Sequence, residues 1–142
     1  MYTRNLYLDK IRPFIEKPVI KVITGMRRSG KSVFIRQVMD LLQEKGVSVS
    51  NILYINKESL EFDFIRGYRE LYDHINQSFQ GCEGQCYLFV DEVQEIEHWE
   101  KAITSFFAEG GIDIYLTGSN AHLLSSEIST LISGRYVEVP LY

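Results

Sequence analysis

The feature that most constrains this chain is a glycine-bounded loop. Residues 25–32 have the sequence GMRRSGKS, which matches the pattern G-x-x-x-x-G-K-[ST] of phosphate-binding loops. The β-branched run at 19–23 predicts a buried strand before the loop, and apolar residues between 32 and 44 predict a well-buried helix after it. This setting predicts a phosphate site, because backbone N–H groups of the loop and the helix N-terminus both favour an anion.

The residue types in the loop have separate physical roles. Gly25 and Gly30 permit the backbone angles that bring successive N–H groups onto a phosphate. We expect Lys31 to reach the β- and γ-phosphates and the Ser32 hydroxyl to ligate Mg²⁺, which prefers oxygen ligands. The predicted nucleotide-binding residues are Gly25, Met26, Arg27, Arg28, Ser29, Gly30, Lys31, Ser32 and Val33. For the two arginines, the alternative is a solvated position at the loop tip.

The other apolar patterns alternate between helices and strands. Leu8, Ile11, Phe14 and Ile15 have helical spacing, which predicts a short N-terminal helix over 6–15 that ends before Pro18. Because the predicted strands are continuously apolar, they indicate a parallel sheet covered on both faces. The expected fold class is α/β, a three-layer sandwich in one domain over 1–142. Further strands are predicted at 51–55, 87–90, 112–116 and 136–141, and further helices at 68–79, 99–107 and 124–132.

An acidic pair follows the apolar run at 87–90. Asp91 and Glu92 are expected at the carboxyl end of that strand, where ligands bind in open α/β sheets. Adjacent carboxylates at such a place are costly without a cation or a reaction to serve. We therefore predict that Asp91 holds Mg²⁺ and that Glu92 is the general base that activates a water. The alternative is an acidic loop with no chemical role, which the phosphate loop upstream disfavours.

Two further candidates come after the strand at 112–116. Asn120, with Thr117 as second choice, is predicted to contact both the γ-phosphate and the attacking water, although Asn120 also suits a helix cap. Arg135 is the only Lys or Arg after Lys101. We predict that Arg135 lies on the surface, away from its own phosphate loop, and reaches a neighbouring subunit's γ-phosphate as an arginine finger. The alternative for Arg135 is a helix-end or surface ion pair.

Composition excludes several classes of protein. No apolar run approaches the roughly 18 residues of a membrane span, and charges run throughout the first 18 residues, unlike a signal peptide. Two cysteines are too few for a disulfide framework, which indicates a reducing cytoplasm. Residues 1–50 carry a net charge of +6 and residues 51–142 a net charge of −10. This split suggests an anion site in the first third, or simply an unevenly charged surface.

The motifs together resemble the AAA+ ATPases, in particular the predicted archaeal and bacterial members with a C-terminal nuclease-like domain. The matching stretches are LYLDKIRPFIEKPVIKVITGMRRSGKS, LFVDEVQEIEHWE and YLTGSNAHLLSSEISTLISGRYVEVPL. The resemblance implies a five-stranded parallel sheet of order 5-1-4-3-2, ATP or ADP as ligand, and Mg²⁺-dependent hydrolysis that drives conformational change in other domains. By this resemblance, Lys31 would contact phosphate, Ser32 and Asp91 would hold the metal, and Glu92 would be the base. Asn120 would be the sensor and Arg135 the arginine finger.

The resemblance also implies a longer protein. We expect the chain to be an ATPase core, with the helix at 6–15 before the α/β domain, without the lid and C-terminal domains of its relatives. Expected partners are nucleotide and, in the full-length protein, further copies of itself. Nucleic acid is a candidate partner that no basic stripe supports, and no membrane is expected. The alternatives are a non-hydrolysing nucleotide-dependent switch and a small-molecule kinase, which would place the acidic strand beside the phosphate-loop strand.

Overall fold

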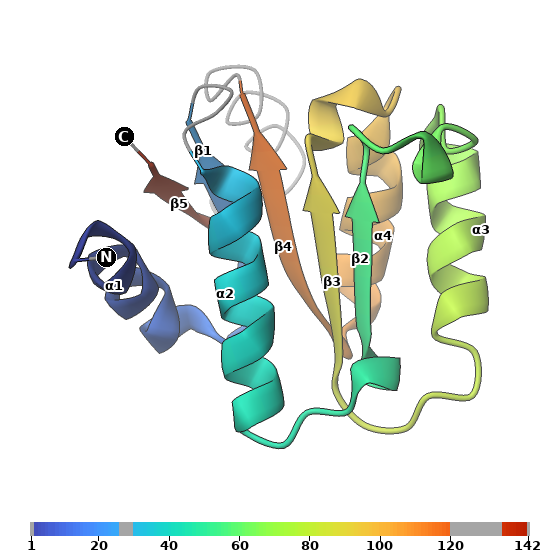
Figure 1. Ribbon diagram of the computed structural model, residues 1–142. Helices are drawn as coiled ribbons and strands as arrows, with labels where there is room; N and C mark the ends of the chain where they lie inside the picture. Colours follow the sequence, from blue (N-terminus) through green and yellow to red (C-terminus); the bar gives the residue numbers. More distant parts are fainter. Residues whose placement is uncertain (1, 26–29, 120–134, 142) are drawn as a thin grey trace.

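The computed structural model describes residues 2–25, 30–119 and 135–141, in which strands and helices alternate (Figure 1). The α-helices are α1 (Tyr2–Ile11), α2 (Lys31–Glu44), α3 (Tyr68–Ser78) and α4 (Trp99–Glu109). The strands are β1 (Ile20–Thr24), β2 (Ile52–Asn56), β3 (Cys86–Asp91), β4 (Ile112–Gly118) and β5 (Tyr136–Pro140). Short 3-10 turns are η1 (Arg12–Phe14), η2 (Val49–Asn51), η3 (Leu60–Phe62) and η4 (Val93–Glu95). The helix predicted at 124–132 lies outside the described residues.

The strands form one parallel sheet in the order β2-β3-β4-β1-β5. This is the predicted order 5-1-4-3-2 counted from the other edge, so the predicted topology is confirmed. β4 separates β1, which leads into the phosphate loop, from β3, which ends in the acidic pair. Because parallel strands have all their carboxyl ends at one edge, Thr24, Asp91 and Gly118 come together there.

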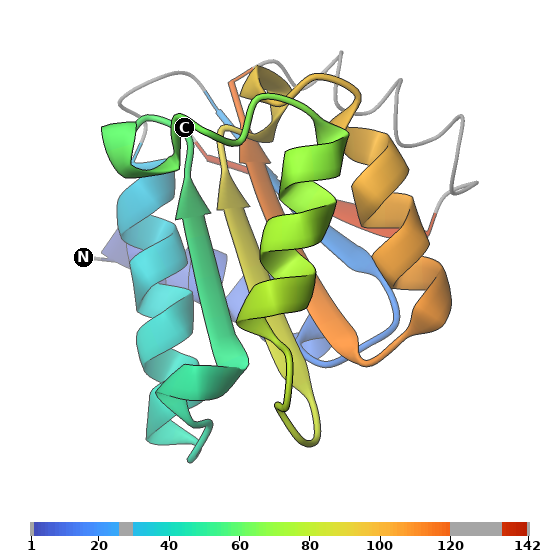
Figure 2. The same cartoon turned by 90° about the vertical axis from the view of Figure 1, so that its right-hand side faces the viewer.

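Helices cover both faces of this sheet, and the predicted three-layer α/β fold is confirmed. α1 and α2 pack on one face, and α3 and α4 pack on the other (Figures 1 and 2). Every residue of β1 and β3 is buried, as a doubly covered parallel sheet requires. In the described part of the chain, no helix is long and apolar enough to cross a membrane.

The N-terminal helix differs from the predicted range of 6–15. The α-helix ends at Ile11, and the chain then tightens into the 3-10 turn η1, which contains Pro13. Proline has no N–H for the helical hydrogen-bond ladder and disfavours the α conformation in the residue before it. The prediction used Pro18 as the stop and was wrong, because Pro13 ends the α-helix first.

Other predicted bounds shift by a residue or two. β1 and β2 each begin and end one residue later than predicted, and β3 includes Asp91 as its last residue. The apolar count of α2 overstated its burial: Val33 is 54% exposed, whereas Phe34 and Ile35 are fully buried. A helix packed on one sheet face buries a stripe rather than its whole circumference.

A charged pair lies inside the amino-terminal half of the sheet. Lys21 on β1 donates to Asp113 on β4, and the two side chains are 0% and 1% exposed. Asp113 also accepts from the Tyr115 hydroxyl at 2.6 Å and from the Glu16 N–H at 2.9 Å. Burial lowers the pKa of Lys21, although the charge of Asp113 opposes this effect. The apolar strand patterns do not indicate the pair, because its members are 92 residues apart.

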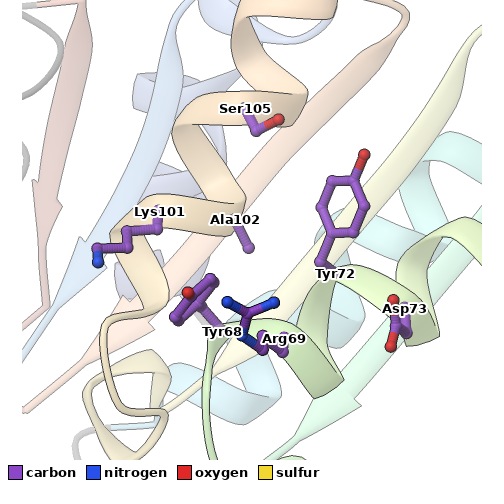
Figure 3. A pocket seen from close by; sticks show the side chains of 7 residues that line it. All are labelled: Tyr68, Arg69, Tyr72, Asp73, Lys101, Ala102 and Ser105. Carbon is purple, nitrogen blue, oxygen red and sulfur yellow. The ribbon is translucent and has the colours of Figure 1, made fainter.

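A cavity of about 450 Å³ lies between α3 and α4 (Figure 3). Tyr68 and Tyr72 line it, and the charged ends of Arg69 and Lys101 each lie over the Tyr68 ring, at 5.3 and 5.1 Å from its centroid. The Tyr72 ring stacks on Phe106 below it. Because α3 and α4 cover the face opposite α2, this cavity is separate from the phosphate loop.

Candidate active site

The phosphate loop connects the carboxyl end of β1 to the first turn of α2. Gly30 is the N-cap of α2, and its φ of 92° is in the left-handed region that favours glycine. The N–H groups of Lys31, Ser32 and Val33 are in the first turn, where a helix supplies no carbonyl partner. The predicted contacts Met26, Arg27, Arg28 and Ser29 lie outside the described residues.

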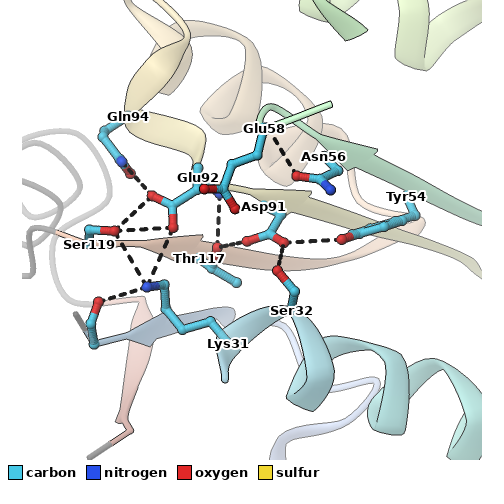
Figure 4. A network of polar contacts seen from close by, with 11 residues as sticks. Lys31, Ser32, Tyr54, Asn56, Glu58, Asp91, Glu92, Gln94, Thr117 and Ser119 are labelled. Carbon is cyan, nitrogen blue, oxygen red and sulfur yellow. Dashed lines mark hydrogen bonds and ion pairs between the residues drawn. The ribbon is translucent and has the colours of Figure 1, made fainter. Parts of the chain in front are cut away.

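Ser32 and Asp91 meet, as predicted for the two residues of one cation site. The Ser32 hydroxyl donates to Asp91 Oδ2 at 2.5 Å (Figure 4). The Tyr54 hydroxyl donates to the same oxygen at 3.0 Å, and Thr117 Oγ1 donates to Asp91 Oδ1 at 2.5 Å. Asp91 is fully buried, so these three hydroxyl groups take the place of water around its carboxylate.

Tyr54 is a donor to Asp91 over the whole neutral range of pH. Burial and the neighbouring charge of Asp91 raise the pKa of Tyr54 to about 12. The phenol is therefore protonated, and its O–H points toward the carboxylate rather than competing with it as an anion.

Glu92 lies between Lys31 and the end of β4. Its carboxylate is 3.4 Å from Lys31 Nζ, accepts from Ser119 Oγ at 2.9 and 3.1 Å, and accepts from Gln94 Nε2 at 2.6 Å. Burial opposes ionisation of Glu92, but the hydrogen bonds from Gln94 and Ser119 and the charge of Lys31 outweigh it and lower the pKa. Glu92 also has a φ of 59°, which turns its side chain out of the strand alternation.

The end of β4 contributes two side chains to this cluster. Thr117 accepts from the Glu92 N–H at 2.9 Å while it donates to Asp91, so it ties the two acidic residues to β4. Ser119 contacts Glu92 and lies 3.4 Å from Lys31 Nζ. The first sensor candidate, Asn120, lies outside the described residues. The contacts of Ser119, like those of Tyr54 and Gln94, were not predicted.

The residues around Asp91 suit a magnesium ion. No group of three or more His, Cys, Asp or Glu able to hold a metal occurs among the described residues. Mg²⁺ does not need such a cage, because proteins commonly hold it through one or two carboxylates together with phosphate oxygens and water. The Ser32 hydroxyl and the Asp91 carboxylate are oxygen ligands of this kind, next to the first turn of α2.

Arg135 is at the other end of the sheet. It immediately precedes β5, its carbonyl accepts from the Ile20 N–H at 3.1 Å, and its side chain is exposed. β5 is parallel to β1, so Arg135 lies at the amino ends of the strands and the phosphate loop at their carboxyl ends. The predicted placement on the surface, away from its own loop, is therefore what the structure shows.

The sequence model of a protein family described as an AAA domain matches residues 17–142. The chain belongs to this AAA family. The match covers the loop, the acidic pair and all five strands. The resemblance to an AAA+ ATPase core is thereby confirmed, whereas the nuclease-like C-terminal domain stays a prediction.

Curated relatives of this AAA domain are longer proteins. An uncharacterized protein of Haemophilus influenzae is 41% identical over 142 residues, which are 100% of this chain and 36% of the relative. An uncharacterized protein of Methanocaldococcus jannaschii is 30% identical over 125 residues, which are 86% of this chain and 26% of the relative. The AAA domain thus spans about a third or less of the length of these relatives.

Solved structures share the fold of this AAA domain. C. elegans PCH-2 superposes with a TM-score of 0.55 at 15% identity, over 97% of this chain and 39% of that chain. S. cerevisiae Hsp104, in an extended complex with casein, superposes with a TM-score of 0.58 at 11% identity, over 100% of this chain and 27% of that chain. These similarities show that the arrangement of the sheet and its helices is that of the AAA+ fold.

Proposed function

We propose that this AAA domain binds ATP and hydrolyses it with Mg²⁺. The observation that carries the proposal is the meeting of two pairs of side chains at one edge of the sheet. Ser32 Oγ is 2.5 Å from the Asp91 carboxylate, and Lys31 Nζ is 3.4 Å from the Glu92 carboxylate. This edge joins a phosphate-loop helix to an acidic strand end, which is the combination that phosphoryl transfer to water uses.

Lys31 and the first turn of α2 are the proposed phosphate contacts. Lys31 Nζ donates to the Gly25 carbonyl at 2.8 Å. The ammonium group therefore lies at the start of the loop, where we propose that it contacts the phosphates. Ser32 and Asp91 would hold the metal, whose charge neutralises phosphate oxygens when bound. The role of the protein here is to keep these donors in place and largely out of water.

Glu92 is the proposed general base. Its lowered pKa keeps the carboxylate ionised near neutral pH, so it is able to accept a proton from water. Ser119 and Gln94 hold the carboxylate oxygens in place. When phosphate oxygens attract Lys31, Glu92 loses part of the positive charge beside it, which makes the carboxylate a stronger base.

The strand order favours hydrolysis over a small-molecule kinase. In such kinases the acidic strand lies beside the phosphate-loop strand, whereas here β4 lies between β1 and β3. β4 brings Thr117 and Ser119 to the acidic pair. Their hydrogen bonds hold Glu92 close to the phosphate loop, where hydrolysis requires a water nucleophile next to the γ-phosphate.

Arg135 is the proposed contact between copies of the chain. It is exposed and makes no ion pair with any residue in the described ranges. Because it lies at the end of the sheet opposite the loop, it reaches a nucleotide only on a neighbouring subunit. We propose that residues 1–142 act as the ATPase core of an oligomer and that hydrolysis drives movement of other domains.

Nucleotide binding by a Lys31→Ala variant tests the proposal. A charge-assisted hydrogen bond contributes about 1.5–3 kcal/mol, so we expect ATP to bind about 10- to 100-fold more weakly and turnover to be lost. Isothermal titration with Mg²⁺-ATP measures the first effect, and phosphate release measures the second. Lys45→Ala is the matched control, because Lys45 is exposed at the far end of α2.

Two results would contradict parts of this proposal. Equal ATP affinity of Lys31→Ala and the unaltered chain would exclude the phosphate site at this loop. Tight, Lys31-dependent ATP binding without turnover in the assembled protein would exclude hydrolysis and favour a nucleotide-dependent switch.

A further inference from the structure

Tyr54 reaches the acidic pair from β2, a strand that supplies none of the predicted site residues. It pairs in register with Phe89, two residues before Asp91 on β3. Side chains two residues apart point to the same face of a sheet, so Tyr54, Phe89 and Asp91 share the face that α2 covers. The length of the tyrosine ring then brings its hydroxyl to 3.0 Å from Asp91 Oδ2.

The Asp91 carboxylate is held from two sides. Thr117 Oγ1 binds Oδ1 and is itself tied to the Glu92 main chain, so that oxygen is fixed relative to β3 and β4. Ser32 and Tyr54 both donate to Oδ2, one from α2 and one from β2 (Figure 4). Without Tyr54, Ser32 would be the remaining hydroxyl on Oδ2 among the described residues.

The two hydroxyl groups on Oδ2 have different further options. A serine hydroxyl has one proton and two lone pairs, so Ser32 is able to donate to Asp91 and still offer its oxygen to a cation. Tyr54 lies on β2, beyond β3 from β4 and β1. The hydrogen bond of its hydroxyl is to the Asp91 carboxylate, on the same oxygen that Ser32 contacts.

We propose that Tyr54 is a positioning residue of the magnesium site: its hydroxyl holds Asp91 Oδ2 in the orientation that receives the cation. The inference rests on the proposed function and adds a residue to it. Hydrogen-bond partners of metal ligands typically change metal affinity by about 10- to 100-fold when they are removed. Tyr54 should accordingly set the affinity for metal while leaving metal-free nucleotide binding unchanged.

The test is Mn²⁺ binding by the ADP complex of a Tyr54→Phe variant, with free Mn²⁺ measured by electron paramagnetic resonance. We expect about tenfold weaker Mn²⁺ binding, with ADP affinity in EDTA within twofold of the unaltered chain. The half-saturating Mg²⁺ concentration for ATP turnover should rise by the same factor, and kcat at saturating Mg²⁺ should change little.

Tyr87→Phe is the matched control. Tyr87 lies on β3 on the same face of the sheet, and its hydroxyl donates to Glu16 at the other end of the strands. The Tyr87→Phe variant loses a buried hydroxyl, but its Mn²⁺ affinity should stay unchanged. Melting temperatures of both variants show whether the fold is kept, because phenylalanine retains the ring that packs in each place.

Three outcomes would overturn the inference. The first is Mn²⁺ affinity of Tyr54→Phe within twofold of the unaltered chain, and the second is an equal loss in Tyr87→Phe. The third is weaker ADP binding in EDTA, because a positioning role at the metal leaves that affinity unchanged. A different result would contradict the proposed function itself: an unaltered chain that binds neither ADP nor nucleotide-dependent Mn²⁺. The inference would then fail together with the proposed function.

Discussion

Each end of the sheet buries a lysine beside a carboxylate, and the two ends differ in what surrounds the pair. At the amino ends, Lys21 and Asp113 are enclosed by the strands and by the segment before β1. At the carboxyl ends, Lys31 and Glu92 lie next to the phosphate loop and the first turn of α2. Similar charges are thus enclosed by packing at one end and lie beside the candidate phosphate site at the other.

The amino-end pair ties the N-terminal segment to the sheet. Lys21 Nζ donates to the Lys17 carbonyl at 2.9 Å, and Asp113 accepts from the Glu16 N–H at 2.9 Å. The short segment between η1 and β1 is therefore joined to both β1 and β4. At this end the charges bind each other and the main chain.

Glu92→Gln should produce the largest effect, a loss of ATP turnover. It changes the candidate site at the carboxyl ends of the strands and leaves the Lys21–Asp113 pair at the amino ends intact. General-base catalysis contributes roughly 10²- to 10⁴-fold, so we expect kcat for ATP hydrolysis to fall by about 1,000-fold with ATP affinity kept within a few-fold. Steady-state phosphate release and ATP titration measure the two quantities. Glu97→Gln is the control, because Glu97 is exposed and five residues further along; a similar loss there would contradict a specific role of Glu92.

Asp113→Ala should act on stability rather than on chemistry. Removal of one partner of a buried ion pair typically costs about 3–5 kcal/mol, because the other charge stays buried and unpaired. We expect that loss in urea unfolding, while the folded fraction still binds ATP. Asp73→Ala on the exposed face of α3 should cost less than about 0.5 kcal/mol. A loss below about 1 kcal/mol in Asp113→Ala would mean that Lys21 finds another partner or water.

Acid titration should produce the smallest effect and should again single out Glu92. Its pKa is lowered from the ordinary value of 4.5, so the unfolded chain binds more protons just below that pH. The stability that ionised Glu92 contributes is present above pH 4.5 and is lost as the pH falls through the lowered pKa. The difference in unfolding free energy between the unaltered chain and Glu92→Gln should therefore shrink as the pH falls below 4.5. A difference that stays constant or widens would contradict the shift.

Much of the fold was predictable because its signals are local. The phosphate loop is eight consecutive residues, and Asp91 and Glu92 directly follow an apolar run. The alternation of apolar strands with amphipathic helices predicted the parallel, doubly covered sheet, since each pattern depends on near neighbours in the chain. The strand order came from the family resemblance, because periodicity does not say which strands are adjacent.

The candidate site was predictable only in part. The motifs predict Lys31, Ser32, Asp91 and Glu92 as site residues, and the structure brings them together. The contacts of Tyr54 and Ser119 were not, because each depends on where β2 and β4 lie relative to β3. A tyrosine in an apolar run and a serine after a strand are ordinary residues until the sheet places carboxylates beside them.

The sequence by itself thus determined the elements, the loop and the acidic pair, because each of these is encoded within a few consecutive residues. Only the tertiary structure decided which hydroxyl groups hold Asp91 and Glu92, and that Lys21 is buried against Asp113. These contacts join residues that are 25 to 92 positions apart. The physical reason is that parallel pairing of β2 with β3, and of β4 with β3 and β1, brings distant residues within hydrogen-bond distance, and no local pattern in the chain records that pairing.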